Sequence, residues 1–215
     1  LNLAELNQNG YAGIWWQGWD SSGQPIAAVD ANYSFSAIDS YVKTATTNML
    51  MVYGQYTNNI ANTTFTNIEN LSISTSDNGT ISNDDLIFAR GVGNYDAKSG
   101  NNDALYADLS AASTAIEFVA GSGITYSYLG STFANFERYL ISTGSGNDFI
   151  DTRTVALDDH LVLGAGNDTV YAGGGSDYIE GGLGNDSLDG GTGNDTIYGG
   201  SGNDTISLIV DGVDI

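Results

Sequence analysis

An apolar residue returns every nine positions in the last third of the chain, between runs of small and polar residues. From residue 163 the sequence reads LGAGNDTVY, AGGGSDYIE, GGLGNDSLD, GGTGNDTIY and GGSGNDTIS, ending at residue 207. The last three residues of each unit hold the apolar position and are β-branched or aromatic in most copies, which favours a very short strand. The first six are mostly Gly, Asn, Ser and Asp, which favour a turn. Each nonapeptide therefore predicts one turn followed by one short strand.

Aspartate keeps the same nine-residue spacing. Two units make one coil with strands on opposite walls, so consecutive turns fall on opposite edges and residues 18 apart stack about 4.8 Å from each other. One edge is then predicted to stack Asp168, Asp186 and Asp204, and the other Asp177 and Asp195.

The stacked aspartates need a positive partner that the sequence does not supply. Two carboxylates about 5 Å apart repel by roughly 1–3 kcal/mol, yet residues 143–207 hold eleven acidic residues and one basic residue, Arg153. Carboxylates and glycine-turn carbonyls, without His or Cys, suit a hard cation of high coordination number, and calcium fits such a ligand set better than magnesium. A glycine-rich solenoid without bound metal is the alternative, but it would leave the aspartate ladders unpaired.

The nonapeptides GGLGNDSLD and GGTGNDTIY resemble the calcium-binding repeats of the RTX (repeats-in-toxin) family, whose pattern is G-G-x-G-x-D-x-U-x with U a large apolar residue. The resemblance implies an all-β fold, a right-handed parallel β-roll, in which each calcium ion lies between two turns on the same edge. One turn would supply the carbonyls of its second and fourth residues and its aspartate, and the turn 18 residues later the carbonyls of its first and third residues and its aspartate. The first implied site combines Gly164, Gly166 and Asp168 with Gly181, Leu183 and Asp186; the second combines Gly182, Gly184 and Asp186 with Gly199, Ser201 and Asp204; the third, on the opposite edge, combines Gly173, Gly175 and Asp177 with Gly190, Thr192 and Asp195.

Two further sites are predicted upstream of the clean repeats. The segment TGSGNDFID, residues 143–151, keeps the glycines and the aspartate, which are Gly144, Gly146 and Asp148. Residues 152–162 are two too many for one unit, but they still place Asp159 in register with Asp177. Sites pairing Asp148 with Asp168 and Asp159 with Asp177 would raise the number of calcium ions from three to five. We expect His160, the only histidine, to be exposed or locally bonded rather than catalytic.

The rest of the chain predicts two less regular regions. Residues 65–142 are expected to form longer, degenerate β-coils that precede the roll at 143–215, with a packed sandwich as the alternative. Residues 1–64 are expected to form an aromatic-rich N-terminal β cap. In this cap, strands are expected at 11–19, 27–38 and 48–57, a turn at 20–25, and a short helix at 1–6 or 37–45.

A tryptophan cluster in the N-terminal region admits two interpretations. Trp15, Trp16 and Trp19 lie close in sequence to Tyr11 and Gln17. Aromatic faces flanked by amides can stack on sugar rings, whereas large aromatic residues more often fill a β core.

Composition and charge exclude several classes of protein. The chain has 26 Asp and Glu against 5 Lys and Arg, a net charge of −21, and no Cys. This balance disfavours nucleic acid as a partner, and the lack of Cys excludes disulfides, Cys-ligated zinc and a thiol nucleophile. No apolar run is long enough for a transmembrane segment. Because the chain starts at Leu1 without a charged n-region, we expect a fragment or a processed piece.

These features together favour a non-enzymatic role. A single His excludes H-E-x-x-H and multi-His zinc centres, and no G-x-S-x-G elbow occurs. We predict a calcium-binding structural module of a secreted or cell-surface bacterial protein, resembling those exported by type I secretion, that folds on binding extracellular calcium. One alternative is an adhesin or surface-assembly subunit that contacts a glycan or another copy through the Trp-rich region. The other is the non-catalytic C-terminal part of a secreted hydrolase.

Overall fold

The computed structural model describes residues 11–45, 47–54, 61–64, 70–74, 84–89, 92–97, 100, 102–120, 125–128 and 130–207; for 11–15, 47–54, 61–64, 70–74, 84–85, 92 and 125–128 only the backbone is described. The helix is α1 (Phe35–Thr44). The strands before residue 143 are β1 (Tyr11–Trp19), β2 (Thr47–Gly54), β3 (Ala61–Thr64), β4 (Asn70–Ser74), β5 (Asp84–Ala89), β6 (Val92–Asp96), β7 (Ala104–Asp108), β8 (Glu117–Val119), β9 (Thr125–Tyr128), β10 (Ser131–Ala134) and β11 (Arg138–Ser142). Those after it are β12 (Phe149–Asp151), β13 (His160–Val162), β14 (Thr169–Tyr171), β15 (Gly174–Gly175), β16 (Tyr178–Leu183), β17 (Ser187–Asp189), β18 (Thr192–Gly193), β19 (Thr196–Ser201) and β20 (Thr205–Ser207).

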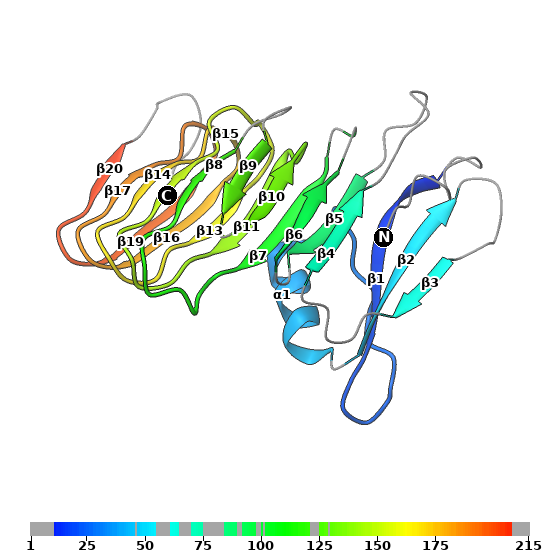
Figure 1. Ribbon diagram of the computed structural model, residues 1–215. Helices are drawn as coiled ribbons and strands as arrows, with labels where there is room; N and C mark the ends of the chain where they lie inside the picture. Colours follow the sequence, from blue (N-terminus) through cyan, green and yellow to red (C-terminus); the bar gives the residue numbers. More distant parts are fainter. Residues whose placement is uncertain are drawn as a thin grey trace.

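The strands stack as the coils of a β-solenoid (Figure 1). One wall is a nine-stranded sheet of order β19-β16-β13-β11-β7-β5-β1-β2-β3, and the other is a five-stranded sheet of order β20-β17-β14-β12-β8. From β11 onward the chain alternates between the two walls, and neighbouring strands in each wall are parallel. The predicted β-roll is therefore confirmed.

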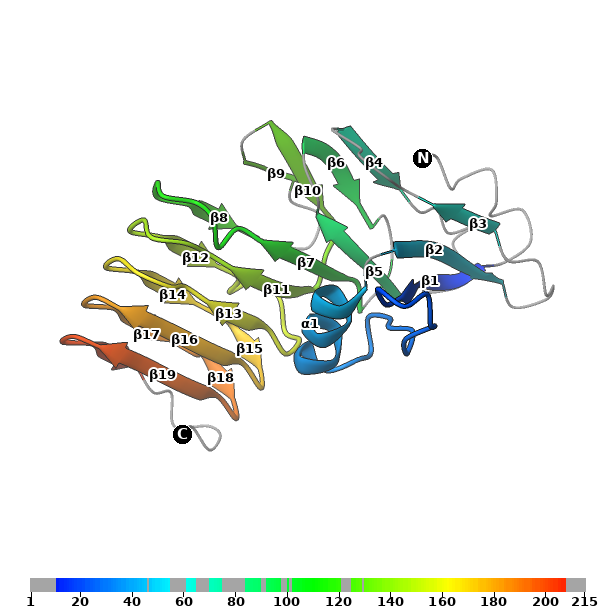
Figure 2. The same ribbon diagram turned by 90° about the horizontal axis from the view of Figure 1, so that it is seen from below.

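The parallel stacking continues upstream of the clean repeats. β5 pairs in parallel with β7 and β7 with β11, while β4, β6 and β10 form a second parallel set beside them. The nine-stranded sheet runs without a break from β1 into the roll (Figure 2). In the described strands of this region, coils rather than a sandwich therefore join the N-terminal strands to the roll.

The register of the roll follows from the spacing of the apolar positions. Leu161 pairs with Ile179 and Ile179 with Ile197, and on the other wall Val170 pairs with Leu188. These residues are all buried between the two walls. In each short strand of the inner coils the middle residue points inward, so one apolar side chain per nonapeptide forms the core.

The helix α1 covers the outer face of the nine-stranded sheet and fits only part of the sequence prediction. Ser34 caps it, because the Ser34 hydroxyl accepts from the Ala37 N–H at 3.4 Å, and Ile38 and Tyr41 are its buried residues. The helix predicted at 37–45 is thus confirmed. The strand predicted at 27–38 is wrong. Oδ1 of Asp30 accepts from the Asn32 N–H at 2.8 Å and so starts a turn, and the Ser34 hydroxyl then caps the helix. The helix predicted at 1–6 lies outside the described residues.

One residue of the tryptophan cluster belongs to the core. Trp16 is 5% exposed, donates from Nε1 to the Leu86 carbonyl at 2.8 Å and packs edge-on against Phe88. The core interpretation is therefore confirmed for Trp16, which has no face free for a sugar ring. The side chains of Trp15 and Tyr11 lie outside the described residues. No helix in the described part of the chain is long and apolar enough to cross a membrane.

Candidate metal centre

Two ladders of buried aspartates run along the edges of the roll. The ladder residues Asp148, Asp159, Asp168, Asp177, Asp186 and Asp195 are each at most 2% exposed. In five of them, all but Asp195, the backbone N–H donates to Oδ1 of the aspartate in the next turn on the same edge. The distances on the first edge are 2.7 Å from Asp148 to Asp168, 2.9 Å from Asp168 to Asp186 and 3.1 Å from Asp186 to Asp204; those on the second are 2.7 Å from Asp159 to Asp177 and 2.9 Å from Asp177 to Asp195. The stacking that the sequence predicts is confirmed.

The second carboxylate oxygen of five ladder residues lacks the neighbour that burial requires. In the described part of the chain, Oδ2 is buried without a hydrogen-bond partner in Asp148, Asp159, Asp168, Asp177 and Asp186. Burial, with the charges of Asp195 and Asp158 added, raises the pKa of Asp177 to about 7. Burial likewise raises the pKa of Asp168 to about 6. A cation at these oxygens would offset the cost of burying an unpaired carboxylate, and it would lower the raised pKa values of Asp168 and Asp177.

Glycine carbonyls surround the same carboxylates. The φ angle of Gly184 is 141°, and a Cβ there would overlap the carbonyl oxygen of Gly166 in the turn below. A Cβ at Gly181 would overlap Oδ2 of Asp186, so this oxygen leans over the first residue of its own turn. Only glycine permits this approach of backbone and carboxylate. The residues implied for the first site therefore lie together at the turn edge.

Hydrogen bonds lock the two turns of that site against each other. The Leu183 N–H donates to the Gly164 carbonyl at 2.8 Å, and the Gly166 N–H donates to the Leu183 carbonyl at 2.8 Å. Backbone hydrogen bonds therefore set the spacing of these two turns. A carbonyl oxygen has a second lone pair, so these bonds leave the carbonyls able to coordinate a cation.

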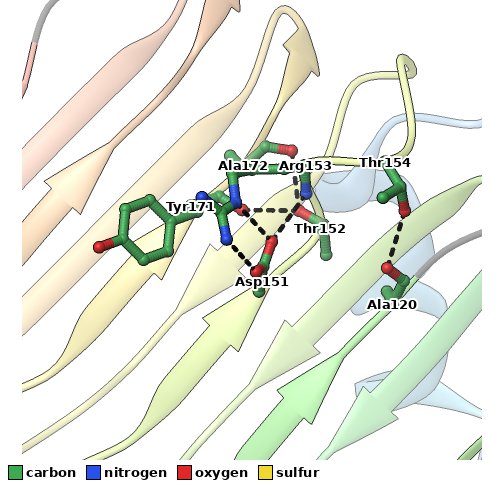
Figure 3. A network of polar contacts seen from close by, with 7 residues as sticks. All are labelled: Ala120, Asp151, Thr152, Arg153, Thr154, Tyr171 and Ala172. Atoms are coloured by element: carbon green, nitrogen blue, oxygen red, sulfur yellow. Dashed lines mark hydrogen bonds and ion pairs between the residues drawn. The ribbon is translucent and has the colours of Figure 1, made fainter.

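Arg153, the basic residue within the repeats, is engaged outside the aspartate ladders. Arg153 forms an ion pair with Asp151 at 2.6 Å, and its guanidinium lies 4.3 Å from the centre of the Tyr171 ring (Figure 3). Among the described residues no three His, Asp or Glu side chains gather as a metal-ligating group. A metal shell at these edges must therefore combine two carboxylates with backbone carbonyls, and oxygen ligands in that number fit calcium.

The first upstream turn has the same arrangement. A Cβ at Gly164 would overlap the carbonyl oxygen of Gly144, and one at Gly166 would overlap that of Gly146. Asp148 and Asp168 thus meet over two glycine carbonyls, as in the clean repeats. The residues fit a calcium ion.

His160 is half-buried between two aromatic rings, whereas the sequence suggested an exposed or locally bonded side chain. Its ring stacks between Phe35, with 3.5 Å between ring centroids, and Tyr178, at 4.3 Å. Burial lowers the pKa of His160 to about 4. These contacts join α1 to the outer face of the roll.

An asparagine ladder beside the aspartates was missed by the sequence analysis. Oδ1 of Asn147, Asn167 and Asn185 accepts from the backbone N–H of Asn167, Asn185 and Asn203, at 2.8, 2.8 and 2.7 Å. The signal was present, because asparagine recurs immediately before the aspartate in these units. This ladder fixes the spacing of the turns on one edge.

The fold and its edges define a β-solenoid with acidic, glycine-rich turns, and the comparison of sequences agrees. Residues 155–188 and 181–208 match the family described as the RTX calcium-binding nonapeptide repeat (4 copies). The chain therefore carries RTX-type calcium-binding repeats over about a quarter of its length. Neither the search of curated proteins nor that of solved structures found a match.

Proposed function

We propose that the chain is a calcium-binding structural module of a secreted or cell-surface bacterial protein, and that it folds when it binds extracellular calcium. One observation carries this proposal: the buried aspartates stack in ladders, and Oδ2 of Asp168, Asp177 and Asp186 has no hydrogen-bond partner in the described part of the chain. The RTX-type repeats and the net charge of −21 support it. No catalytic role is proposed.

Four sites follow from the turn geometry. Three are the clean sites, which join Asp168 to Asp186, Asp186 to Asp204 and Asp177 to Asp195. The fourth joins Asp148 to Asp168, where the glycine carbonyls lie as in the clean turns.

The proposed mechanism is a fold switch governed by free calcium. At the low free calcium of a bacterial cytosol the aspartates repel one another and the roll opens. At the millimolar calcium outside the cell each ion neutralises two carboxylates, and its binding free energy becomes folding free energy. The module then forms only after export.

Calcium titration of the full chain tests the proposal. Far-ultraviolet circular dichroism in EGTA is expected to show little β-structure, and added calcium is expected to restore it while the same concentration of magnesium does not. Calorimetry on the same samples should record saturable binding of several ions. Complete β-structure in EGTA together with no measurable calcium binding would refute the proposal.

A matched pair of variants separates the ladder from general charge. Asp186→Asn removes a buried ladder carboxylate, and Asp108→Asn removes a carboxylate at an exposed position at the end of β7. Only Asp186→Asn is expected to lower the affinity for calcium. Equal affinities in the two variants would place the binding outside the ladders.

A further inference from the structure

The second upstream turn, residues 152–159, departs from the calcium-site geometry of the other turns. In the clean turns a Cβ at the fourth residue would overlap the carbonyl oxygen of the fourth residue in the turn below, as for Gly184 over Gly166. At Gly175 the nearest carbonyl oxygen is that of Leu157, and it would lie 2.8 Å from the Cβ. At Gly173 the nearest carbonyl oxygens are those of Thr152, at 3.0 Å, and Val155, at 3.1 Å. The two extra residues of this turn have therefore displaced its carbonyl oxygens. These oxygens lie farther from a Cβ at Gly173 or Gly175 than the corresponding oxygens would lie from a Cβ at the glycines of the clean turns.

In this turn a threonine hydroxyl binds a carbonyl oxygen that would otherwise be available to a metal ion. Thr152 is the first residue of the unit, and its Oγ1 donates to the Ala172 carbonyl at 2.8 Å (Figure 3). The Ala172 carbonyl is the one that the repeat pattern would assign to a calcium ion between Asp159 and Asp177.

A protein cation supplies charge at the same turn. Arg138 donates from Nε to the Asp158 carbonyl at 2.8 Å, and its positive charge acts on the carboxylates of Asp158 and Asp159. Its Nη1 donates to the carbonyls of Ala31 and Tyr33, at 2.7 and 3.1 Å. The guanidinium therefore ties the loop before α1 to the first turn on this edge of the roll.

Thr143 provides a contrast on the opposite edge. Its hydroxyl also donates to the carbonyl of Leu163, the first residue of the next unit on that edge, at 2.6 Å. There, however, the carbonyls of Gly144 and Gly146 keep the clean column. Oδ2 is buried without a hydrogen-bond partner in both Asp148 and Asp159, so this oxygen does not distinguish the two turns. A hydroxyl alone does not close a site; the displaced carbonyls and the arginine distinguish the turn at 152–159.

We propose that the turn of residues 152–159 binds no calcium, because its carbonyl oxygens are displaced, and that Thr152 and Arg138 instead hold it as a metal-independent junction between the N-terminal region and the roll. The inference rests on the proposed calcium function of the other turns. It changes the expected number of calcium ions at paired turns from five to four. The junction also gives the roll a first turn that stays closed when calcium is absent.

Ion counting on matched variants of the full chain tests the inference. Asp148→Asn and Asp159→Asn each remove one buried carboxylate of the first coil, on opposite edges, and Asn keeps the Oδ1 acceptor in both. Equilibrium dialysis against calcium, with metal analysis of the dialysed protein, should find one ion fewer than wild type for Asp148→Asn and the wild-type number for Asp159→Asn. Loss of one ion from Asp159→Asn would overturn the inference.

A measurement on the unmodified protein covers the case in which a variant fails to fold. Crystals grown in calcium and measured at a long X-ray wavelength show each calcium ion by its anomalous scattering. A peak is expected between Asp168 and Asp186 and none between Asp159 and Asp177. A peak at both places would overturn the inference and leave the proposed function standing, whereas no peak at any turn would remove the proposed function itself.

Discussion

Acid should promote folding of the metal-free protein, because protons can neutralise the ladder in place of calcium. Burial raises the pKa of Asp177 to about 7 in the folded chain, against 3.8 for an ordinary aspartate. The folded state therefore binds more protons than the unfolded state between these two values, and the free energy of unfolding rises as the pH falls through that window. Asp168, with its pKa raised to about 6, acts in the same direction.

The size of the effect follows from the shift at Asp177. A shift of roughly three units corresponds to about 4 kcal/mol as an upper limit for this one carboxyl. For a chain of this length that free energy is equivalent to roughly 10 °C in the thermal midpoint. The assay is circular dichroism in EGTA from pH 8 down to pH 5, which stays above the isoelectric point near 4.1.

Two variants isolate the source of the pH dependence. Asp177→Asn should raise the β-structure of the metal-free protein at pH 8 and weaken the gain at lower pH, while the exposed control Asp108→Asn should behave as wild type. In saturating calcium the sign reverses, because protons then compete with the ion for the carboxylates. Loss of β-structure in EGTA on going from pH 8 to pH 5 would refute the reasoning.

Three further predictions concern single positions of the roll. Asp186 belongs to two proposed sites and Asp195 to one, so Asp186→Asn should release two calcium ions by equilibrium dialysis and Asp195→Asn one; equal losses would contradict the shared ligand. Ile179→Ala should lower the free energy of urea unfolding in calcium by about 2–5 kcal/mol, because Ile179 is fully buried, whereas Ile206→Ala at a 41% exposed side chain should cost less than about 1 kcal/mol. Gly184→Ala should weaken calcium binding, because a left-handed φ costs about 1–2 kcal/mol in any L-residue and the new Cβ would displace the Gly166 carbonyl; unchanged affinity by calorimetry would show that the turn can shift at little cost.

The roll could be predicted from the sequence because its period fixes the register. Once two nonapeptides make a coil, the position of Asp186 above Asp168 follows from counting, and the structure places them so. The turn at 152–162 shows the limit of this prediction, because its unit has two residues more than the repeat. Counting correctly placed Asp159 in the ladder. The path of the two extra residues, however, depends on local backbone angles. The displaced carbonyls and the hydrogen bond of the Thr152 hydroxyl could therefore be seen only in the structure.

The N-terminal region was harder to predict because no repeat constrains it. The spacing of Ile38, Tyr41 and Val42 did indicate α1, whereas the aromatic and β-branched residues of 27–38 suggested a strand that is absent from residues 27–34. Ser34 decides between the two, since its hydroxyl caps the helix. The role of Arg138 depends on contacts more than 100 residues apart in the sequence, which no local pattern contains.

The hydrogen bonds of the aspartate ladders give the roll a direction. In the five hydrogen bonds between ladder aspartates of the described chain, the N–H points toward the C-terminal end and the accepting Oδ1 comes from the following coil, as between Asp168 and Asp186. Each coil is thus completed by the one after it, and removing the last coil would take away an acceptor that the coil before it uses. Inserting a further pair of nonapeptides would preserve every contact of this kind, so the length of such a roll can change by whole coils without altering either end.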